Sequence, residues 1–165
     1  MIVLRPITPE DDSFLACLYA STRADELAIT GWSAEQKAMF CRIQFAAQTA
    51  DYRANYPGAT FQIIERNGVP AGRLLVSRSE EDILVIDIAL LPEHRGAGIG
   101  TKLLRELQDE AKAAGKALTI HVERFNPALR LYERLGFKQV EEKGVYLLME
   151  WRGDGASHEG HKGIG

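Results

Sequence analysis

A glycine-rich loop between an apolar run and an amphipathic pattern constrains this chain more than any other feature. The run Ile83–Leu91 is apolar except at Asp87, as expected of a strand buried on both faces, and a helical pattern starts at Ile99. Glycine occupies every second position from Gly96 to Gly100. The first N–H groups of a helix are unpaired and lie at the positive end of its dipole, and glycine lets an anion approach them closely. The segment therefore predicts phosphate binding at a helix start.

Two familiar phosphate-binding patterns fit this loop poorly. A Walker loop ends in Lys followed by Ser or Thr, whereas here Thr101 precedes Lys102. A dinucleotide fingerprint needs G-x-G-x-x-G, and the spacing here is G-x-G-x-G. Glu123 could take the place of the acid that binds the ribose in a Rossmann fold. However, a Rossmann fold begins with the strand, glycine loop and helix, whereas here hairpin-linked strands come first. A nucleotide-binding βαβ protein is therefore disfavoured.

The remaining periodicity predicts a strand, two helices, three hairpin-linked strands, and then a helix, a strand, a helix and two strands. Thr8-Pro9 marks the first helix start, and Ser33 with Gln36 resembles a capping box at the second. Asn67-Gly68 predicts a tight hairpin, because both residues tolerate positive φ. The expected strands are 2–7, 61–64, 74–76, 83–91, 117–122, 137–140 and 145–149, and the expected helices are 8–30, 33–56, 99–115 and 128–135.

The second helix has a regular apolar pattern. Its apolar side chains recur at spacings of three, four, three and four residues, which indicates a long amphipathic helix. They are Phe40, Ile43, Ala47, Ala50 and Ala54. The helix is expected to end near Pro57-Gly58. Beside this stripe, Gln44, Gln48 and Tyr52 follow at four-residue steps and are expected to share a face.

Composition excludes several classes of protein. The 165 residues include 20 Lys and Arg against 23 Asp and Glu, so the basic excess of a nucleic-acid binder is missing. The most apolar run has nine residues, far short of a membrane span, and no pattern marks a signal peptide. Cys17 and Cys41 lack metal-type spacing, so we expect free thiols in a reducing cytoplasm and no metal site. We expect one domain over residues 1–152 and a flexible tail over 153–165.

The glycine loop and a second segment together resemble the GNAT-type (GCN5-related) N-acetyltransferase family. The pattern Arg95-x-x-Gly98-x-Gly100 is similar to that family's acyl-CoA pyrophosphate loop. The stretch from Asn126 through Tyr132 to Gly136-Phe137 is similar to its second motif, and the element order over about residues 2–150 is similar as well.

The resemblance implies an α/β (α+β) fold with a mixed, mostly antiparallel central sheet of six or seven strands, flanked by about four helices. In this fold the strand at 83–91 splays from the strand at 117–122, and the wedge between them takes acyl-CoA. The implied activity is direct transfer of an acetyl group from acetyl-CoA to a primary amine in a ternary complex. The alternative is a non-catalytic acyl-CoA-binding or sensing module on the same fold.

The resemblance also implies roles for individual residues. The backbone of Ile88 and Leu90 would pair with the pantetheine amides, and the Leu90 N–H would donate to the oxyanion of the tetrahedral intermediate. Tyr132 would protonate the leaving thiolate, or would only pack and bind cofactor through its hydroxyl. The pyrophosphate would be held by Arg95, Gly96, Gly98, Gly100 and Thr101, and Asn126 would contact the cofactor arm.

The general base stays open. Many family members have a Glu on the strand before the loop, but Leu84 stands at the corresponding register here. Asp87, His121, Glu26 or a water relay could accept the proton of the acceptor ammonium. We expect a buried, hydrogen-bonded His121 more than a catalytic one.

The acceptor would be a small-molecule or protein amine, with no nucleic acid or membrane partner. The candidates for binding it, on the N-terminal helices, are Glu26, Trp32, Gln44 and Gln48. A solvated polar stripe is an equally good interpretation of the glutamines. An exposed final strand would allow a homodimer by strand pairing.

Overall fold

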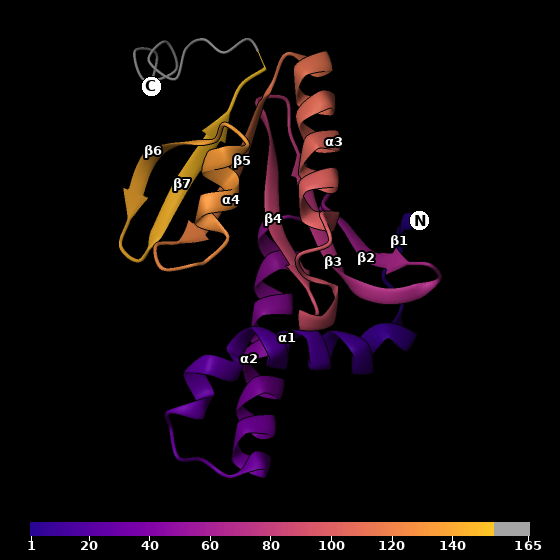
Figure 1. Cartoon of the computed structure of the whole chain (residues 1–165), viewed down its shortest axis with the longest axis vertical. Coiled ribbons are helices and arrows are strands. Elements are labelled where there is room, and N and C mark those ends of the chain that lie inside the picture. Colours follow the sequence, from indigo (N-terminus) through magenta and orange to yellow (C-terminus); the bar gives the residue numbers. More distant parts are fainter. Residues whose placement is uncertain (154–165) are drawn as a thin grey trace. The chain divides into compact units, whose positions relative to one another are not determined.

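The computed structural model describes residues 1–153 and has the element order that the periodicity predicts (Figure 1). The expected tail lies, beyond Gly153, outside the described residues. The helices are α1 (Asp12–Ala28), α2 (Ala34–Asn55), α3 (Ile99–Ala114) and α4 (Leu129–Arg134), with short 3-10 helices η1 (Pro9–Asp11) and η2 (Pro92–His94). The strands are β1 (Ile2–Pro6), β2 (Thr60–Arg66), β3 (Val69–Arg78), β4 (Asp82–Leu90), β5 (Ala117–Glu123), β6 (Lys138–Lys143) and β7 (Tyr146–Trp151).

The strands follow the hydrogen-bonded order β1-β2-β3-β4-β5-β7-β6, and the chain divides into two compact units. The N-terminal unit comprises Met1–Leu75 and Ile88–Ala97. The C-terminal unit comprises Val76–Asp87 and the chain from Gly98 onward. The mixed, mostly antiparallel seven-stranded sheet with four helices confirms the expected fold class. A single domain over residues 1–152 stays a prediction.

Local signals set the element starts in the N-terminal unit as expected. Thr8 and Asp11 form a capping box at η1, and the Ser33 hydroxyl accepts a hydrogen bond from the Gln36 N–H at α2. The hairpin between β2 and β3 has φ of 53° at Asn67, a left-handed value that favours Asn or Gly. These features confirm the sequence-based predictions for both helix starts and the hairpin.

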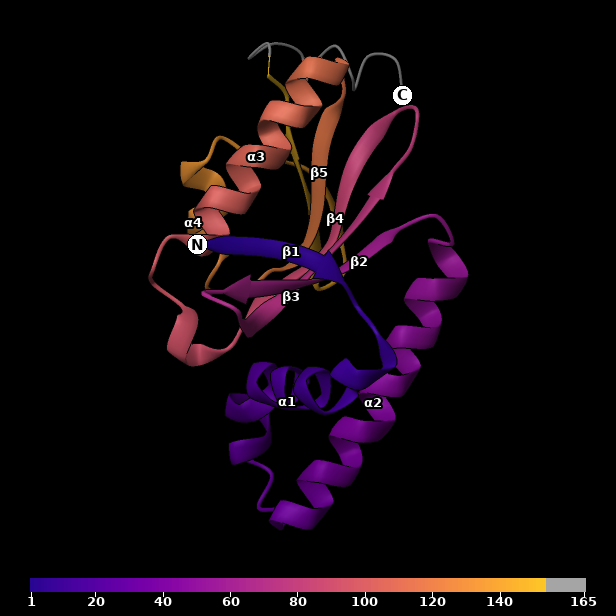
Figure 2. The ribbon, with the colours of Figure 1, turned by 90° about the vertical axis from the view of Figure 1, so that its right-hand side faces the viewer.

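Helices α1 and α2 lie side by side in the N-terminal unit, as Figure 2 shows. Leu15 and Leu18 of α1 pack with Ile63 of β2, and Ala89 and Leu91 pack against this cluster. A second cluster joins the two helices through Tyr19, Leu27 and Cys41. These contacts fix α1 against the end of β4.

Phe40 of the apolar stripe of α2 packs against the cluster of Tyr19, Leu27 and Cys41, but the rest of the stripe does not face that cluster. Cys41 is buried and Phe45 packs in both apolar clusters, whereas Ile43 is 60% exposed. The three alanines of the stripe, Ala47, Ala50 and Ala54, are also exposed. The expected helix is confirmed, but most of its packed face is turned to the opposite side, because the bulk of Phe45 fills space against α1 better than alanine.

In the C-terminal unit, α3 lies along β5 (Figures 1 and 2). β4 and β5 are parallel, in a register that runs from Asp82–Ala117 to Val85–Ile120. On its other side, β5 pairs with β7 along its length as far as Glu123. β4 continues past its last pair with β5 to Leu90. The register between β4 and β5 thus ends at Val85–Ile120, before either strand ends. The prediction that the whole run from Ile83 is buried on both faces is wrong, because residues 86–90 are only half-buried.

The final strand lies inside the sheet rather than at its edge. β7 pairs with β5 on one side and β6 on the other. The edge strand β6 has the sequence KQVEEK, and its charged residues discourage pairing with a second chain. The expectation of a dimer through an exposed final strand is therefore wrong.

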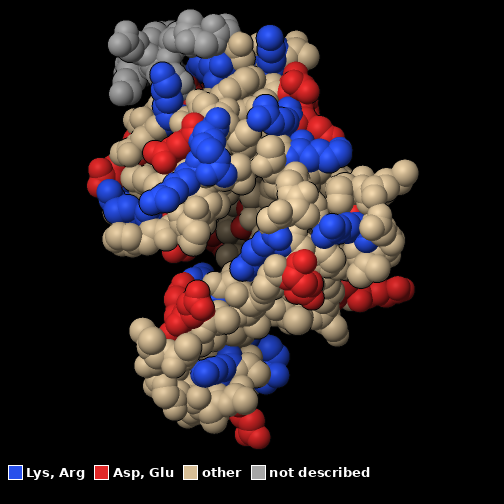
Figure 3. Space-filling view, in the orientation of Figure 1, with Lys and Arg blue, Asp and Glu red and all other residues tan. Residues whose placement is uncertain are grey.

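Within residues 1–153, no helix is both long and apolar enough to cross a membrane. Basic and acidic side chains are interspersed on the face that Figure 3 presents. This mixture agrees with the small net charge of −3.

Candidate active site

The glycine loop turns the chain from β4 into α3 through two left-handed residues. Gly96 has φ of 77° and Gly98, the N-cap of α3, has φ of 80°, values that L side chains rarely adopt. The Lys102 N–H donates to the Gly98 carbonyl at 3.0 Å, which closes the first turn. The first turn contains no acidic side chain, so its positive end is not neutralised by the chain itself. The backbone N–H groups up to Thr101 are therefore suited to binding an anion.

Arg95 lies at the start of this loop and is exposed. Its Nε donates to the Leu90 carbonyl at 3.0 Å, which uses one of the five guanidinium N–H donors. The Leu91 N–H donates to the Ala71 carbonyl at 2.9 Å and extends the β3–β4 pairing to the loop. The end of β4 and the loop are thus held together.

Gly72 on β3 controls how closely the end of β4 approaches. A Cβ at Gly72 would lie 2.1 Å from the Ala89 carbonyl oxygen and 2.9 Å from a Leu90 side-chain carbon. No other residue fits without a backbone shift. Sequence reasoning missed this position, although an isolated glycine in a strand is a recognised sign of close backbone approach.

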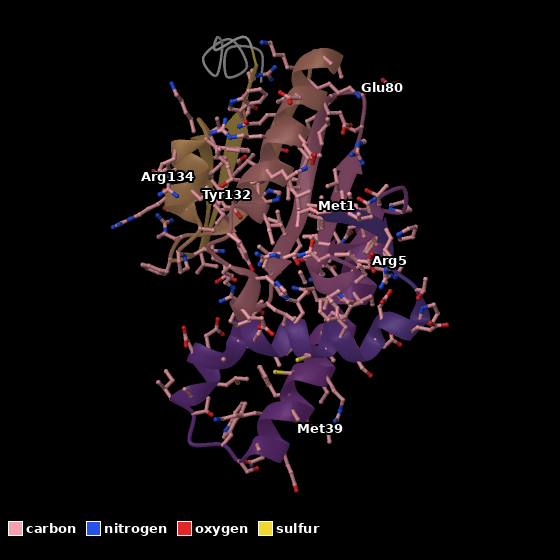
Figure 4. The ribbon with its side chains drawn as sticks, turned by 45° about the vertical axis from the view of Figure 1, so that its right-hand side comes forward. Met1, Arg5, Met39, Glu80, Tyr132 and Arg134 are labelled. Carbon is pink, nitrogen blue, oxygen red and sulfur yellow. The ribbon has the colours of Figure 1, made fainter. Side chains whose placement is uncertain are left out.

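Tyr132 is held rigidly on α4 in the C-terminal unit (Figure 4). Its side chain is buried, and its ring packs edge-on to Phe137 with centroids 5.9 Å apart. Gln108 of α3 donates to the Leu135 carbonyl at 2.9 Å, which ties the end of α4 to α3. Gly136 has φ of 97°, which explains the glycine in the second motif.

The phenol of Tyr132 is a weak acid in this environment. Burial raises its pKa to about 12, and the negative charge of Asp87 on β4 adds to the effect. The hydroxyl is therefore protonated through the neutral and mildly alkaline range. Asp87 is half-buried and lies two residues beyond the last registered pair of β4 and β5.

Asn126 shapes the entry to α4. Its Oδ1 accepts a hydrogen bond from the Ala128 N–H at 2.8 Å, and its carbonyl accepts from the Leu129 N–H at 3.0 Å. The side chain thus forms a local turn of the Asx type. Because Oδ1 has this structural role, Nδ2 is the group suited to a ligand.

A strand, a left-handed glycine loop, a helix start and a buried tyrosine thus follow one another in the expected order. The family model described as acetyltransferase (GNAT) family matches residues 21–137. The chain belongs to the GNAT family.

Curated GNAT relatives match about half of the chain. Streptothricin acetyltransferase of Streptomyces lavendulae is 38% identical over 82 residues, which cover 47% of this chain and 43% of that protein. The ribosomal protein bS18 alanine N-acetyltransferase of Haemophilus influenzae is 31% identical over 86 residues, or 52% of this chain and 58% of that protein. The chain spans about half the length of these two relatives.

The solved PaiA N-acetyltransferase from Thermoplasma acidophilum, in complex with coenzyme A, has the same fold. Its TM-score is 0.68 at 20% identity, and the match covers 92% of this chain and 99% of that chain.

The base candidates of this GNAT chain differ in environment. His121 is exposed on β5, so the expectation of a buried histidine is wrong. Its neighbours Ile120 and Val122 are buried, and side chains alternate along a strand, so His121 points away from the core. Desolvation, and after it the charge of Lys143, lowers the pKa of His121, whereas Glu141 and Asp82 oppose the change. The imidazole of His121 is therefore neutral at pH 7. Glu26 forms an exposed ion pair with Arg23 at 3.1 Å.

The acceptor candidates in the N-terminal unit differ in their partners and exposure. Trp32 packs on Phe40 with ring centroids 5.3 Å apart. Gln44 is exposed, whereas Gln48 is half-buried and its Oε1 accepts from Nη2 of Arg73 at 2.8 Å. Gln44 and Gln48 lie one turn apart on α2, so they share a face as expected, but only Gln48 is engaged by Arg73.

Arg73 is the polar residue that sequence reasoning missed. It is only 7% exposed, and its guanidinium lies 5.7 Å from the Phe45 ring centroid. An arginine within the otherwise apolar strand 69–76 is the signal that could have identified it.

Proposed function

We propose that this chain transfers an acetyl group from acetyl-CoA to a primary amine within a ternary complex. The observation that carries the proposal is the first turn of α3, where left-handed Gly98 exposes N–H groups with no acid beside them. Membership of the GNAT family supports the choice of acetyl-CoA as the anionic ligand. The solved relative with coenzyme A supports the same choice.

The cofactor would be held mainly by backbone groups. Ile88 and Leu90 would pair with the pantetheine amides, because both lie in the half-buried part of β4 beyond its register with β5. Asn126 would donate from Nδ2 to the cofactor arm. The diphosphate would accept hydrogen bonds from the loop, involving Arg95, Gly96, Gly98, Gly100 and Thr101.

The chemical step begins when the amine nitrogen attacks the thioester carbon. The Leu90 N–H would stabilise the oxyanion that forms. The C–S bond then breaks, and the thiolate takes the proton of Tyr132. The acylated nitrogen releases its extra proton to solvent, and solvent returns a proton to the Tyr132 phenolate. The raised pKa of Tyr132 keeps this proton in place at any pH at which the amine is a nucleophile, and it also makes the phenol a weaker acid toward the thiolate.

The acceptor nitrogen must lose a proton before or during attack, since an alkylammonium has a pKa near 10. The candidate acceptors of this proton are Asp87, His121, Glu26 and a water relay. The electrostatic coupling of Asp87 to Tyr132 favours Asp87 over Glu26, which is exposed and paired with Arg23. Neutral His121 is a second route.

The acceptor is an amine of a small molecule or a protein. The names of the relatives support both classes, since one acts on streptothricin and another on an alanine of a ribosomal protein. Glu26, Trp32, Gln44 and Gln48 are proposed to contact it. We infer a cytoplasmic location, which the free thiols of Cys17 and Cys41 support.

The test is release of CoA from acetyl-CoA with a panel of small amines and peptide N-termini, beside direct measurement of acetyl-CoA binding. Binding with turnover on at least one amine is expected. Binding without turnover on any amine favours the non-catalytic acyl-CoA module. No binding of acetyl-CoA would overturn both.

A further inference from the structure

Helix α2 has a second apolar face that its own chain leaves exposed. We name Phe40, Ile43, Ala47, Ala50 and Ala54 the outer stripe. Phe40 is half-buried, because one side of its ring packs against its own chain, and the other four are exposed. Met39, which Figure 4 labels on the N-terminal half of α2, lies beside the stripe and is 52% exposed. A helix that is apolar on two sides is one that packs on two sides.

The spacing of the outer stripe is that of a helix-pairing seam. Alternating steps of three and four residues average 3.5, the repeat of a coiled coil, in which each apolar side chain enters a hole on a facing helix. α2 has 22 residues and is therefore about 33 Å long, enough for three such repeats. The matching partner for this seam is another helix.

The two halves of the outer stripe differ in size. Phe40 and Ile43 occupy the N-terminal half, and alanines occupy the C-terminal half. A shallow hollow of about 580 Å³ lies over the N-terminal half, lined by Trp32, Glu35, Gln36, Met39, Phe40 and Ile43. In an antiparallel pair, the large half of each helix faces the small half of the other, with Phe40 opposite Ala50 and Ile43 opposite Ala47.

The charges on one flank of the stripe match the same arrangement. Lys37, Gln44 and Asp51 follow at seven-residue steps and therefore occupy one flank. Antiparallel pairing about Gln44 sets each Lys37 opposite Asp51 of the second copy. One Asp51 oxygen accepts from Asn55, which leaves the carboxylate charge in place. In a parallel pair in register, this flank would instead face the other flank of the partner helix, so Lys37 and Asp51 would not meet.

We propose that the outer stripe is a dimer interface in which α2 packs antiparallel against α2 of a second copy, about a two-fold axis at the level of residues 44 and 45. The partner is a second copy because reversing the helix sets its large side chains opposite its small ones and its Lys37 opposite its Asp51. The interface lies wholly in the N-terminal unit and does not depend on the proposed binding of acetyl-CoA. It would cover Gln44 and the hollow beside Trp32, so it competes with the acceptor contacts proposed for these two residues.

The first test is sedimentation equilibrium of the full chain from low micromolar to several hundred micromolar concentration. A reversible dimer is expected, and Ile43→Glu should weaken it by at least about a hundredfold, because it buries an unpaired charge. Val69→Glu is the matched control: Val69 is 55% exposed on β3, and its dimer should be unchanged. A wild-type chain that stays monomeric throughout, or an Ile43→Glu dimer as tight as the wild type, would overturn the proposal.

The second test is a charge-exchange cycle. Lys37→Asp and Asp51→Lys should each raise the dimer dissociation constant about tenfold, since the symmetry doubles the effect of one modest ion pair. The double variant Lys37→Asp/Asp51→Lys restores opposite charges and should bring the constant back toward the wild-type value. A double variant weaker than both single variants would contradict the antiparallel arrangement.

The third test fixes the direction of pairing by cysteine cross-linking in a Cys17→Ser background. Gln44→Cys should form a disulfide between copies, because it lies beside the axis. Ala50→Cys should not, since five residues from the axis separates the two thiols by about 15 Å along the helix. The reverse result would show parallel pairing and overturn the proposal.

Discussion

The guanidinium Nε of Arg95 donates a hydrogen bond to the backbone carbonyl of Leu90, with 3.0 Å between the two atoms. Leu90 is the last residue of β4, and Arg95 opens the glycine loop. The proposed oxyanion donor and the proposed diphosphate loop are therefore held in one local arrangement. Changes to the loop are expected to affect acetyl-CoA binding without removing any catalytic group.

Gly98→Glu is expected to lower acetyl-CoA affinity by at least about a hundredfold. The substitution places a negative charge at the positive helix end, where like-charge contact costs several kcal/mol. It also forces a side chain into a left-handed backbone with φ of 80°. Isothermal titration calorimetry with acetyl-CoA measures the loss.

Gly115→Ala is the control for the backbone strain that Gly98→Glu introduces. Gly115 caps the other end of α3 with φ of 68°, so alanine there carries similar strain far from the loop along the same helix. Its melting temperature should fall while acetyl-CoA affinity stays within about twofold. Equal losses of affinity in both variants would show that the loop does not bind the cofactor.

Tyr132→Phe is expected to slow acetyl transfer by about a hundredfold or more, as removal of a general acid does. The ring contact with Phe137 is preserved, so acetyl-CoA affinity should change little. Steady-state CoA release and a binding titration on the same variant test this. The control is Tyr19→Phe, which removes the hydroxyl of another buried tyrosine and should leave the rate of acetyl transfer unchanged. A normal rate in Tyr132→Phe would show that Tyr132 only packs.

Gly72→Ala is expected to destabilise the protein by about 1–3 kcal/mol, the usual cost of overpacking. Its Cβ would meet the Ala89 carbonyl oxygen at 2.1 Å and push the end of β4 away. Acetyl transfer should fall as well, because Leu90 moves. Gly58→Ala is the control, since a Cβ there meets nothing within 4 Å; denaturant unfolding that treats the two variants alike would contradict the close approach.

Asp11→Asn is expected to lower the free energy of unfolding at pH 7 by about 1–2 kcal/mol. Hydrogen bonds from Arg5, and secondarily the Thr8 N–H, hold the pKa of Asp11 at about 2, below its ordinary 3.8. Because the folded-state pKa is depressed, this stability is complete above about pH 4–5 and is lost as the pH falls through about 2.

Chemical denaturation at pH 7 and near pH 2 checks this, with Glu10→Gln of the same 3-10 helix as control. The deficit of Asp11→Asn should shrink at the lower pH, whereas Glu10→Gln should match the wild type at both. A deficit that stays constant would exclude the linkage.

The sequence predicted features that depend on near neighbours in the chain. The capping of α2 by Ser33, the hairpin at Asn67-Gly68 and the glycine loop before α3 each follow from one or two side chains and local backbone geometry. The joint pattern of the glycine loop and the motif around Tyr132 predicted the family, because both occur at a set separation along one chain.

The tertiary structure decided what depends on distant partners. An apolar stripe specifies that a helix face prefers to be covered, but not by what; α2 uses Cys41 and Phe45 against its own chain and leaves Ile43 outside. Strand order depends on which edges meet, so the final strand lies between β5 and β6. The sequence by itself determined the local elements and the family; burial, sheet order and the acidity of Tyr132 came from contacts between segments far apart in the chain.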